Sequence, residues 1–295
     1  MNTIYFDSED TDDLRRERLY AGQLYVYKPT ESSRALCAHA RAMAEEAFAP
    51  LDPRTAQDEM AVEDYASLLA SLKPEFIHHP KSKELIQGIL EELGCDLQKT
   101  HFDVPRLRTS TSDGYLTSGI AYAFKPHRDT WYSTPQCQLN WWLPVYPIES
   151  DNAMAFHTRY WDRAVHNDSS EFNYQEWGKT GRKTAAQHIK ADTRKQTVAQ
   201  ETLQLDPQLR VITRTGGVLV FSAAHLHSSV PNTSGKTRLS IDFRTVHLDD
   251  LITNRGAPNI DSSCTGTTIR DYLCAADLDH LPDEVIARYE KSTRP

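Results

Sequence analysis

Histidine and aspartate side chains stand at spacings that could bring them to one metal ion. His127 and Asp129 form a His-x-Asp pair at the end of a predicted strand, where side chains two residues apart point to the same side. This pair alone is a weak signal, but a later predicted strand leads into two more candidates, His225 and His227. Two histidines and one carboxylate are the ligand set typical of non-haem iron(II) oxygenases. Such a set leaves about three positions on the ion for a bidentate co-substrate and dioxygen.

An arginine and a serine follow these later histidines. Arg238 and Ser240 lie two residues apart on a predicted strand, so they share one face. A dicarboxylate such as 2-oxoglutarate, bound to a metal by its keto acid end, needs a fixed cation at its far carboxylate, and a guanidinium group has the matching geometry. The Ser240 hydroxyl could donate a hydrogen bond to the same carboxylate. A purely structural metal would not need this anchor.

The joint pattern resembles the phytanoyl-CoA dioxygenase-like branch of the iron(II)/2-oxoglutarate-dependent oxygenases. The matching text is HRD at 127–129 and HSSVPNTSGKTR at 227–238. In that branch the second metal histidine is followed by small residues, then by an asparagine five positions on and an arginine eleven positions on. Here these are His227, Asn232 and Arg238. The motif-level resemblance covers roughly residues 101–248.

The same resemblance separates the two later histidines. His227 has the family's distance to Arg238, whereas His225 stands thirteen residues before it and lacks the small-residue context. We therefore assign the metal to His227 and expect His225 to pack or hydrogen-bond nearby. One departure is Gly217, which replaces the acid usual in the preceding Gly-Asp-aliphatic-Phe strand and touches no predicted ligand.

The resemblance implies a mainly β fold with helical additions, built on a double-stranded β-helix (jelly roll, cupin-like) core. It implies iron(II) held by His127, Asp129 and His227, with 2-oxoglutarate and dioxygen as co-substrates. The reaction would oxidise a C–H bond of a small-molecule metabolite or natural-product intermediate and release succinate and CO2. Halogenating relatives lack the carboxylate that Asp129 provides, so hydroxylation is favoured. Desaturation, cyclisation and demethylation on the same fold remain alternatives, as does a non-catalytic cupin-like protein that binds a metal or ligand.

Further pocket candidates surround this core pattern. Gln138 and Asn140 share one face of a predicted strand and could hydrogen-bond the carboxylates of the co-substrate. Trp131 and Tyr132 lie just after the His-x-Asp pair and could line the substrate entrance. Arginines could give the mouth of the pocket a positive charge for an anionic substrate: Arg106, Arg108, Arg159 and Arg163.

The chain is expected to form one oxygenase domain, residues 1–295, in three zones. Residues 1–100 are mostly helical in pattern, residues 101–248 contain the jelly-roll core, and residues 249–295 form a C-terminal tail. A polar insertion at 160–204 is too long for a hairpin loop, so it is a candidate lid. Within it, the basic run 179–195 is interpreted as a helix face in solvent.

Local patterns within these zones predict individual elements. Strong helix formers and capping residues favour helices, and short β-branched or aromatic runs between turn residues favour strands. The predicted helices cover 35–51, 62–72, 82–93 and 282–291. The predicted strands cover 19–27, 101–110, 118–126, 137–146, 152–157, 209–215, 217–223 and 236–246.

The composition limits the class of protein. The 295 residues include 33 Lys and Arg against 41 Asp and Glu, a net charge of −8, which argues against a nucleic-acid binder. No run reaches the roughly 18 apolar residues that span a bilayer, so no membrane partner is expected. The five cysteines are widely spaced and form no CxxC pair, which favours a reducing cytoplasm over a disulfide or zinc framework. Composition leaves the choice between monomer and homodimer open.

Overall fold

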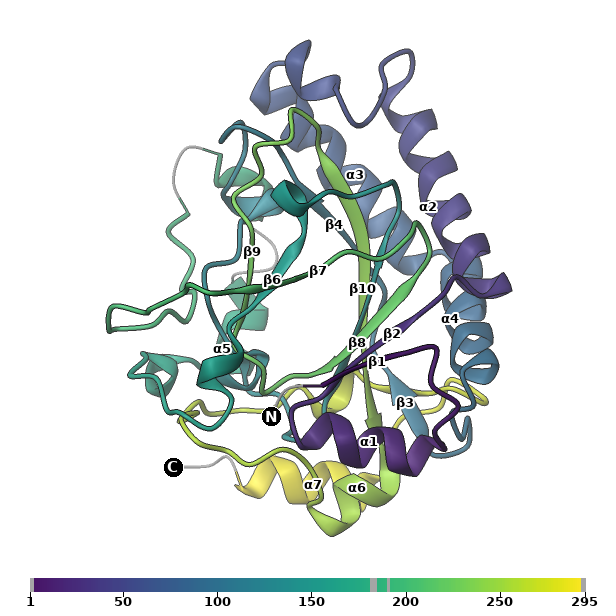
Figure 1. Ribbon diagram of the computed structural model, residues 1–295, viewed down its shortest axis with the longest axis vertical. Coiled ribbons are helices and arrows are strands. Elements are labelled where there is room, and N and C mark those ends of the chain that lie inside the picture. Colours follow the sequence, from purple (N-terminus) through teal and green to yellow (C-terminus); the bar gives the residue numbers. More distant parts are fainter. Residues whose placement is uncertain (1–2, 181–184, 190–191, 293–295) are drawn as a thin grey trace.

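Two β-sheets face each other, and helices cover the outer face of the larger sheet (Figure 1). The computed structural model describes residues 3–180, 185–189 and 192–292. The larger sheet contains β1 (Ile4–Phe6), β2 (Leu24–Tyr27), β3 (Thr100–Phe102), β4 (Arg106–Ser110), β5 (Leu139–Pro144), β8 (Val218–Ser222), β10 (Arg238–His247) and β11 (Leu273–Cys274). The smaller sheet contains β6 (Met154–Phe156), β7 (Leu209–Val211) and β9 (His227–Ser229).

The chain alternates between the two sheets. It passes from β4 and β5 in the larger sheet to β6 and β7 in the smaller one, returns to β8, crosses to β9 and comes back to β10. Among the strands that the structure describes, every pairing is antiparallel except that of β1 with β2. This alternation is the arrangement of a double-stranded β-helix, so the predicted mainly β fold with helical additions is confirmed.

Strand β10 is the longest strand and the centre of the larger sheet. It pairs with β5 on one side and with β4 and then β3 on the other. Its even-numbered residues from Arg238 to Arg244 face the inside of the β-core, where Arg238, Asp242 and Arg244 line a cavity. Leu239, Ile241 and Phe243 point outward into the core beneath the helices.

Helices cover the outer face because each has one apolar side. In α2 a capping box between Thr30 and Ser33 begins the helix, and Leu36, Ala40 and Ala44 form the buried side. These residues pack in one core with the outer face of the larger sheet. The described helices are α1 (Asp12–Tyr20), α2 (Glu31–Phe48), α3 (Val62–His78), α4 (Pro80–Glu92), α5 (Tyr174–Thr180), α6 (Leu248–Thr253) and α7 (Asp283–Ser292).

A second, smaller core fills part of the space between the sheets. Trp142 and Phe221 from the larger sheet meet Met154 and Phe156 from the smaller one. Trp142, Met154 and Phe221 also line the cavity, so the cavity begins where this core ends. The remaining space between the sheets is therefore available to a ligand.

Two sequence predictions about local structure were wrong. The predicted strand 19–27 is divided, because Thr11 caps helix α1, which continues to Tyr20, and only β2 is extended. The predicted strand 118–126 is instead a short 3-10 turn, Gly119–Ala121. The insertion holds its first residues, because Ser118 Oγ donates to the carbonyls of His188 and Ile189, at 2.8 and 2.7 Å. Near its end the carbonyl of Phe124 accepts from the N–H of Ser229 in β9 at 3.0 Å.

The length and polarity of the helices also bear on membranes. Among the described residues, none of the helices combines the length and the apolar character needed to cross a bilayer.

Phe243→Ala should lower the free energy of unfolding by about 3–5 kcal/mol, because it removes a fully buried ring that stacks on Trp141 at 5.6 Å. Urea unfolding followed by circular dichroism measures this change. Phe6→Ala is the control, since that ring is 68% exposed and its loss should change stability by no more than about 0.5 kcal/mol. Equal effects of the two changes would contradict the assignment of Phe243 to the core.

Candidate active site

The backbone brings His127 and His227 together. The two residues form an isolated antiparallel bridge in which each N–H donates to the other carbonyl, at 3.0 and 2.9 Å. Residues paired in this way project their side chains to the same side. The imidazole rings accordingly lie 4.5 Å apart between centroids. An isolated bridge residue, His127, and one strand of the smaller sheet, β9, thus supply two neighbouring candidate ligands.

Hydrogen bonds orient both imidazole rings. Nδ1 of His127 faces the carbonyl of Lys125 at 2.8 Å, and Nδ1 of His227 faces the carbonyl of His225 at 3.0 Å. A carbonyl oxygen only accepts, so each Nδ1 carries the proton and each Nε2 keeps a free lone pair for a metal. Burial and the nearby His127 lower the pKa of His227 to about 4, which keeps that ring neutral near pH 7.

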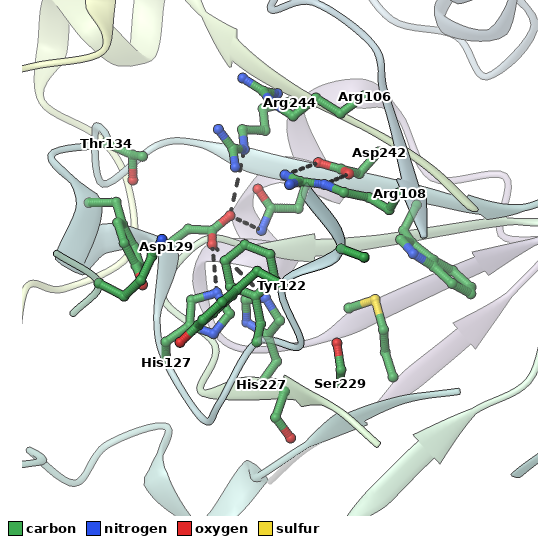
Figure 2. Close-up of a pocket in the computed structure, with 18 of the residues that line it drawn as sticks. Arg106, Arg108, Tyr122, His127, Asp129, Thr134, His227, Ser229, Asp242 and Arg244 are labelled. Atoms are coloured by element: carbon green, nitrogen blue, oxygen red, sulfur yellow. Dashed lines mark hydrogen bonds and ion pairs between the residues drawn. The ribbon is translucent and has the colours of Figure 1, made fainter. Parts of the chain in front are cut away.

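Asp129 completes the cluster. Its Oδ1 lies 3.3 Å from Nε2 of His127 and 4.0 Å from Nε2 of His227 (Figure 2). The ligand atoms of the three buried residues all lie within 4.8 Å of one another, so a single ion can contact all three. The donor set of two imidazoles and one carboxylate on one side suits a divalent transition metal with open positions.

A network of side chains holds the second oxygen of Asp129. Asn140 donates to Oδ2 at 2.8 Å and Gln138 donates to it at 3.4 Å, while the hydroxyl of Tyr272 donates to Gln138 Oε1 at 2.6 Å. Nε of Arg244 stands 3.7 Å from the same oxygen. Burial raises the pKa of Asp129, but Arg244 and the two histidines of the cluster lower it by a larger amount. The pKa therefore lies well below its usual value, and the carboxyl group is ionised. Oδ1 is left for the metal.

The residue between the two ligands of the His-x-Asp pair points the opposite way. Arg128 has an extended backbone and a fully buried side chain. Its Nε donates to Asp261 Oδ2 at 2.9 Å, and its guanidinium group also donates to the carbonyls of Ala224 and Tyr160. Arg128 therefore fastens the His-x-Asp segment to the loop before β9, to the insertion and to the C-terminal tail.

Arg238 and Ser240 carry buried polar atoms without partners. Nη1 of Arg238 donates to the carbonyl of Asn152 at 2.7 Å, and its guanidinium group lies over the ring of Trp142 at 5.6 Å. Nε of Arg238 and Oγ of Ser240 are buried and have no hydrogen-bond partner. Unsatisfied buried donors are costly, and a bound carboxylate would satisfy them. Burial lowers the pKa of Arg238 to about 10, which still leaves it charged.

Asn232 sets the distance between His227 and Arg238. Its side-chain amide donates to the carbonyls of Ser110 and Lys236, both at 2.8 Å. These bonds fasten the turn between β9 and β10 to the end of β4. The asparagine in the motif therefore has a structural role in this chain.

A cavity of about 250 Å³ adjoins the metal cluster. Of the residues predicted to contact a co-substrate or substrate, five line it: Arg106, Arg108, Tyr132, Asn140 and Arg238. Ser240 and Gln138 lie fully buried behind its wall, on the inward faces of β10 and of the segment before β5. The structure places two other candidates, Trp131 and Arg159, off this wall.

The positions of these two residues have simple causes. Trp131 is fully buried against Tyr160 and Leu226, and its indole N–H donates to Asp261 at 2.8 Å. Arg159 is exposed to solvent. The candidate His225 is buried against Trp161, with ring centroids 4.6 Å apart, and is not part of the metal cluster.

Sequence reasoning missed several residues of the cavity. Lys73 comes from α3, and Arg244 and Asp242 continue the inward face of β10. Alternation from Arg238 could have identified the residues on β10, but no local pattern marks Lys73. Arg194 also lines the cavity, although its segment 179–195 was interpreted as facing solvent. Part of that segment lies outside the described residues.

Comparisons with known proteins give distant structural likenesses. No family model matches the chain, and no curated protein matches its sequence. Solved structures that resemble it include the apo non-heme monooxygenase ThoJ (TM-score 0.47, 14% identity, 94% of each chain covered). Another is the epimerase SnoN in complex with Fe3+, alpha ketoglutarate and nogalamycin RO, with a TM-score of 0.41, 15% identity and coverage of 80% of this chain and 85% of that one. A third is the carbocyclase SnoK from nogalamycin biosynthesis, with a TM-score of 0.38, 12% identity and coverage of 94% of this chain and 95% of that one.

These TM-scores are all below 0.5 and the identities below 25%, so the likenesses carry no argument about this chain. The predicted membership in the phytanoyl-CoA dioxygenase-like branch remains a prediction.

His227→Ala should reduce the affinity for Co(II), a spectroscopic substitute for iron(II), by at least about 100-fold, because one of three ligands is lost. Absorbance titration of the purified protein measures this affinity. His225→Ala is the matched control and should retain Co(II) binding. The reverse result would mean that His225 is the ligand.

Arg128→Met should lower the free energy of unfolding by about 3–5 kcal/mol, because it leaves the buried carboxylate of Asp261 without its cationic partner. It should also weaken Co(II) binding, although Arg128 is not a ligand. Urea unfolding and the same titration give the two values. Arg159→Met, at an exposed arginine, should change neither. Unchanged Co(II) affinity in Arg128→Met would show that metal binding does not depend on the contacts of Arg128 with Asp261, Ala224 and Tyr160.

Proposed function

We propose that the protein is an iron(II)- and 2-oxoglutarate-dependent oxygenase that acts on a C–H bond of a small molecule. The observation that carries the proposal is the pairing of two incomplete features in one cavity. His127, Asp129 and His227 offer three ligand atoms to one ion, and Arg238 on the cavity wall, with Ser240 behind it, carries a buried donor without a partner. A co-substrate that binds the metal by a keto acid at one end and carries a carboxylate at the other end would suit both the ligand cluster and Arg238.

The chain's own residues have distinct tasks in this proposal. The two imidazole Nε2 atoms and Oδ1 of Asp129 hold the ion on one side and leave its other side to the cavity. The guanidinium group of Arg238 binds the far carboxylate of 2-oxoglutarate and fixes its orientation. When bound, iron(II) supplies the oxidative decarboxylation of 2-oxoglutarate by dioxygen that drives oxidation of the substrate. Aromatic side chains around the cavity exclude water from the reacting atoms.

Hydroxylation is the outcome that we propose first, because Asp129 occupies the position that a halide would need. Desaturation, cyclisation and demethylation start from the same oxidising step, and the mass of the product distinguishes them. A cupin-like protein that holds a purely structural metal would have no use for the buried, unsatisfied donors of Arg238 and Ser240. This is the observation that favours an enzyme.

The protein is first loaded with iron(II) under anaerobic conditions. After oxygen is admitted, it should convert 2-oxoglutarate slowly to succinate, even when no primary substrate is present. Succinate is measured by liquid chromatography and mass spectrometry. His127→Ala is the control for adventitious iron and should produce none, because it removes one of the two imidazole ligands. A metal-loaded protein that forms no succinate would support the non-catalytic alternative.

Arg238→Ala should raise the KM for 2-oxoglutarate at least about tenfold, because hydrogen bonds to charged groups contribute about 1.5–3 kcal/mol. Ser240→Ala should raise it less, since a neutral hydroxyl contributes about 0.5–1.5 kcal/mol. Succinate formation over a range of 2-oxoglutarate concentrations gives both values. An unchanged KM in Arg238→Ala would remove this residue from the binding of 2-oxoglutarate.

A further inference from the structure

One wall of the cavity is rich in positive charge. Besides Arg238, five cationic side chains line the cavity among the described residues, and Asp242 is the one carboxylate besides the metal-site Asp129. In Figure 2 Arg106, Arg108 and Arg244 lie with Asp242 on the opposite side of Asp129 from the two histidines. The five cations are Lys73, Arg106, Arg108, Arg194 and Arg244.

Most of these cations already have an acidic partner. Asp242 accepts from Arg108 at 2.5 and 3.2 Å, and Asp103, behind the wall, accepts from Arg106 at 2.6 Å and lies 3.6 Å from Arg244. Asp192 pairs with Arg194 at 2.6 Å. Each of these arginines is thus held in place by a carboxylate.

Lys73 is different. It comes from α3, which packs along β4, and its ammonium group donates to the backbone carbonyl of Ile120. It forms no ion pair with a carboxylate of the described residues. Burial and the neighbouring Arg108 lower the pKa of Lys73 to about 7, and the attraction of Asp242 offsets this only in part. An anion bound beside Lys73 would supply the missing negative charge.

Aromatic rings connect this charged wall to the metal cluster. The guanidinium group of Arg108 lies over Phe124 at 5.4 Å, and the ring of Phe124 stacks on His127 at 5.0 Å. Tyr132 packs edge-to-face with His127, with ring centroids 5.7 Å apart, and Phe172 packs in the same way with Tyr132, with centroids 5.1 Å apart. Flat rings pack well against such a series of aromatic faces and edges.

We propose that the primary substrate carries an oxyanion group on a flat, aromatic carbon skeleton, with the anion bound by Lys73 and Arg108. The skeleton lies along Phe124 and Tyr132, which places a C–H bond of its far part beside the metal ligands. The reaction that would follow binding rests on the proposed function, whereas the binding of the anion does not depend on it. Two anion sites then lie in one cavity: Arg238 for 2-oxoglutarate and Lys73 with Arg108 for the substrate.

The test uses matched pairs of probes that differ in charge. Benzoate, 2-naphthoate and biphenyl-4-carboxylate are each compared with their primary amide, and 2-naphthyl phosphate compares a phosphate with a carboxylate. Cyclohexanecarboxylate tests the need for an aromatic ring. Isothermal titration calorimetry with the metal-free full chain measures binding without any dependence on iron chemistry. At least one aryl oxyanion should bind about tenfold more tightly than its neutral partner and than the cyclohexane acid.

Variants locate the anion. Lys73→Met should remove most of this tenfold preference, whereas Lys73→Arg should keep most of it. Lys99→Met is the matched control, because Lys99 is an exposed lysine outside the cavity, and it should behave as the wild type. Thermal melting of each variant confirms that it is folded. Arg108→Gln provides a second measurement and should also lower the preference.

Three results would overturn the proposal. One is equal binding of every oxyanion and its neutral partner, or no binding of any probe. Another is a Lys73→Met variant that keeps the preference. The third is a Lys73→Met variant that needs more 2-oxoglutarate instead, which would assign Lys73 to the co-substrate. Preference for oxyanions without any succinate formation would refute the proposed oxygenase reaction and leave the anion site standing.

Discussion

The whole site depends on one pair of backbone hydrogen bonds, those that join His127 and His227. These residues are a hundred positions apart in the sequence, and they meet because the segment before β5 pairs at His127 with β9 of the smaller sheet. The bridge sets the separation of the two imidazoles, and the following extended residue, Arg128, turns Asp129 back to the same side. Every other contact of the cluster refines positions that this pairing has already established. The metal cluster is thus a property of how the two sheets meet.

The two faces of strand β10 have different surroundings, since one face packs in the core under the helices and the other faces the cavity. Its outward residues pack under the helices, and its inward residues, Arg238, Ser240, Asp242 and Arg244, form a row of polar groups. Burying so many polar groups is costly, and neighbouring strands and opposite charges offset that cost for all but a few atoms. On this face Nε of Arg238, Oγ of Ser240 and Nε of Arg244 remain without hydrogen-bond partners. Stability is supplied by one face of the strand, which leaves the other face free for binding.

Much of the fold could be predicted from the sequence, because periodic apolar residues and caps act locally. Helices α2, α3 and α4 and most core strands follow from such patterns. His127 and Arg238 became candidates only through the joint pattern of the His-x-Asp pair, the later histidine and the Arg-x-Ser pair. The strand prediction for segment 118–126 was wrong because its first residues, Ser118 and Gly119, hydrogen-bond to the distant insertion, which local propensity cannot show. Lys73 and Arg194 reach the cavity from a helix and from the insertion, so only the tertiary structure reveals them. Residues that act by long-range packing leave no signature in their own neighbourhood.

The supports of the metal ligands come from the last part of the chain. Asp261 binds Arg128 and Tyr272 binds Gln138, yet both follow the final core strand. During synthesis on the ribosome, all three ligands therefore emerge before the groups that hold their neighbours in place. A nascent chain that ends after β10 would contain the complete ligand set without its rigid frame. The order of translation thus separates possession of the ligands from a finished site, which delays a well-formed metal centre until the tail has folded against the β-core.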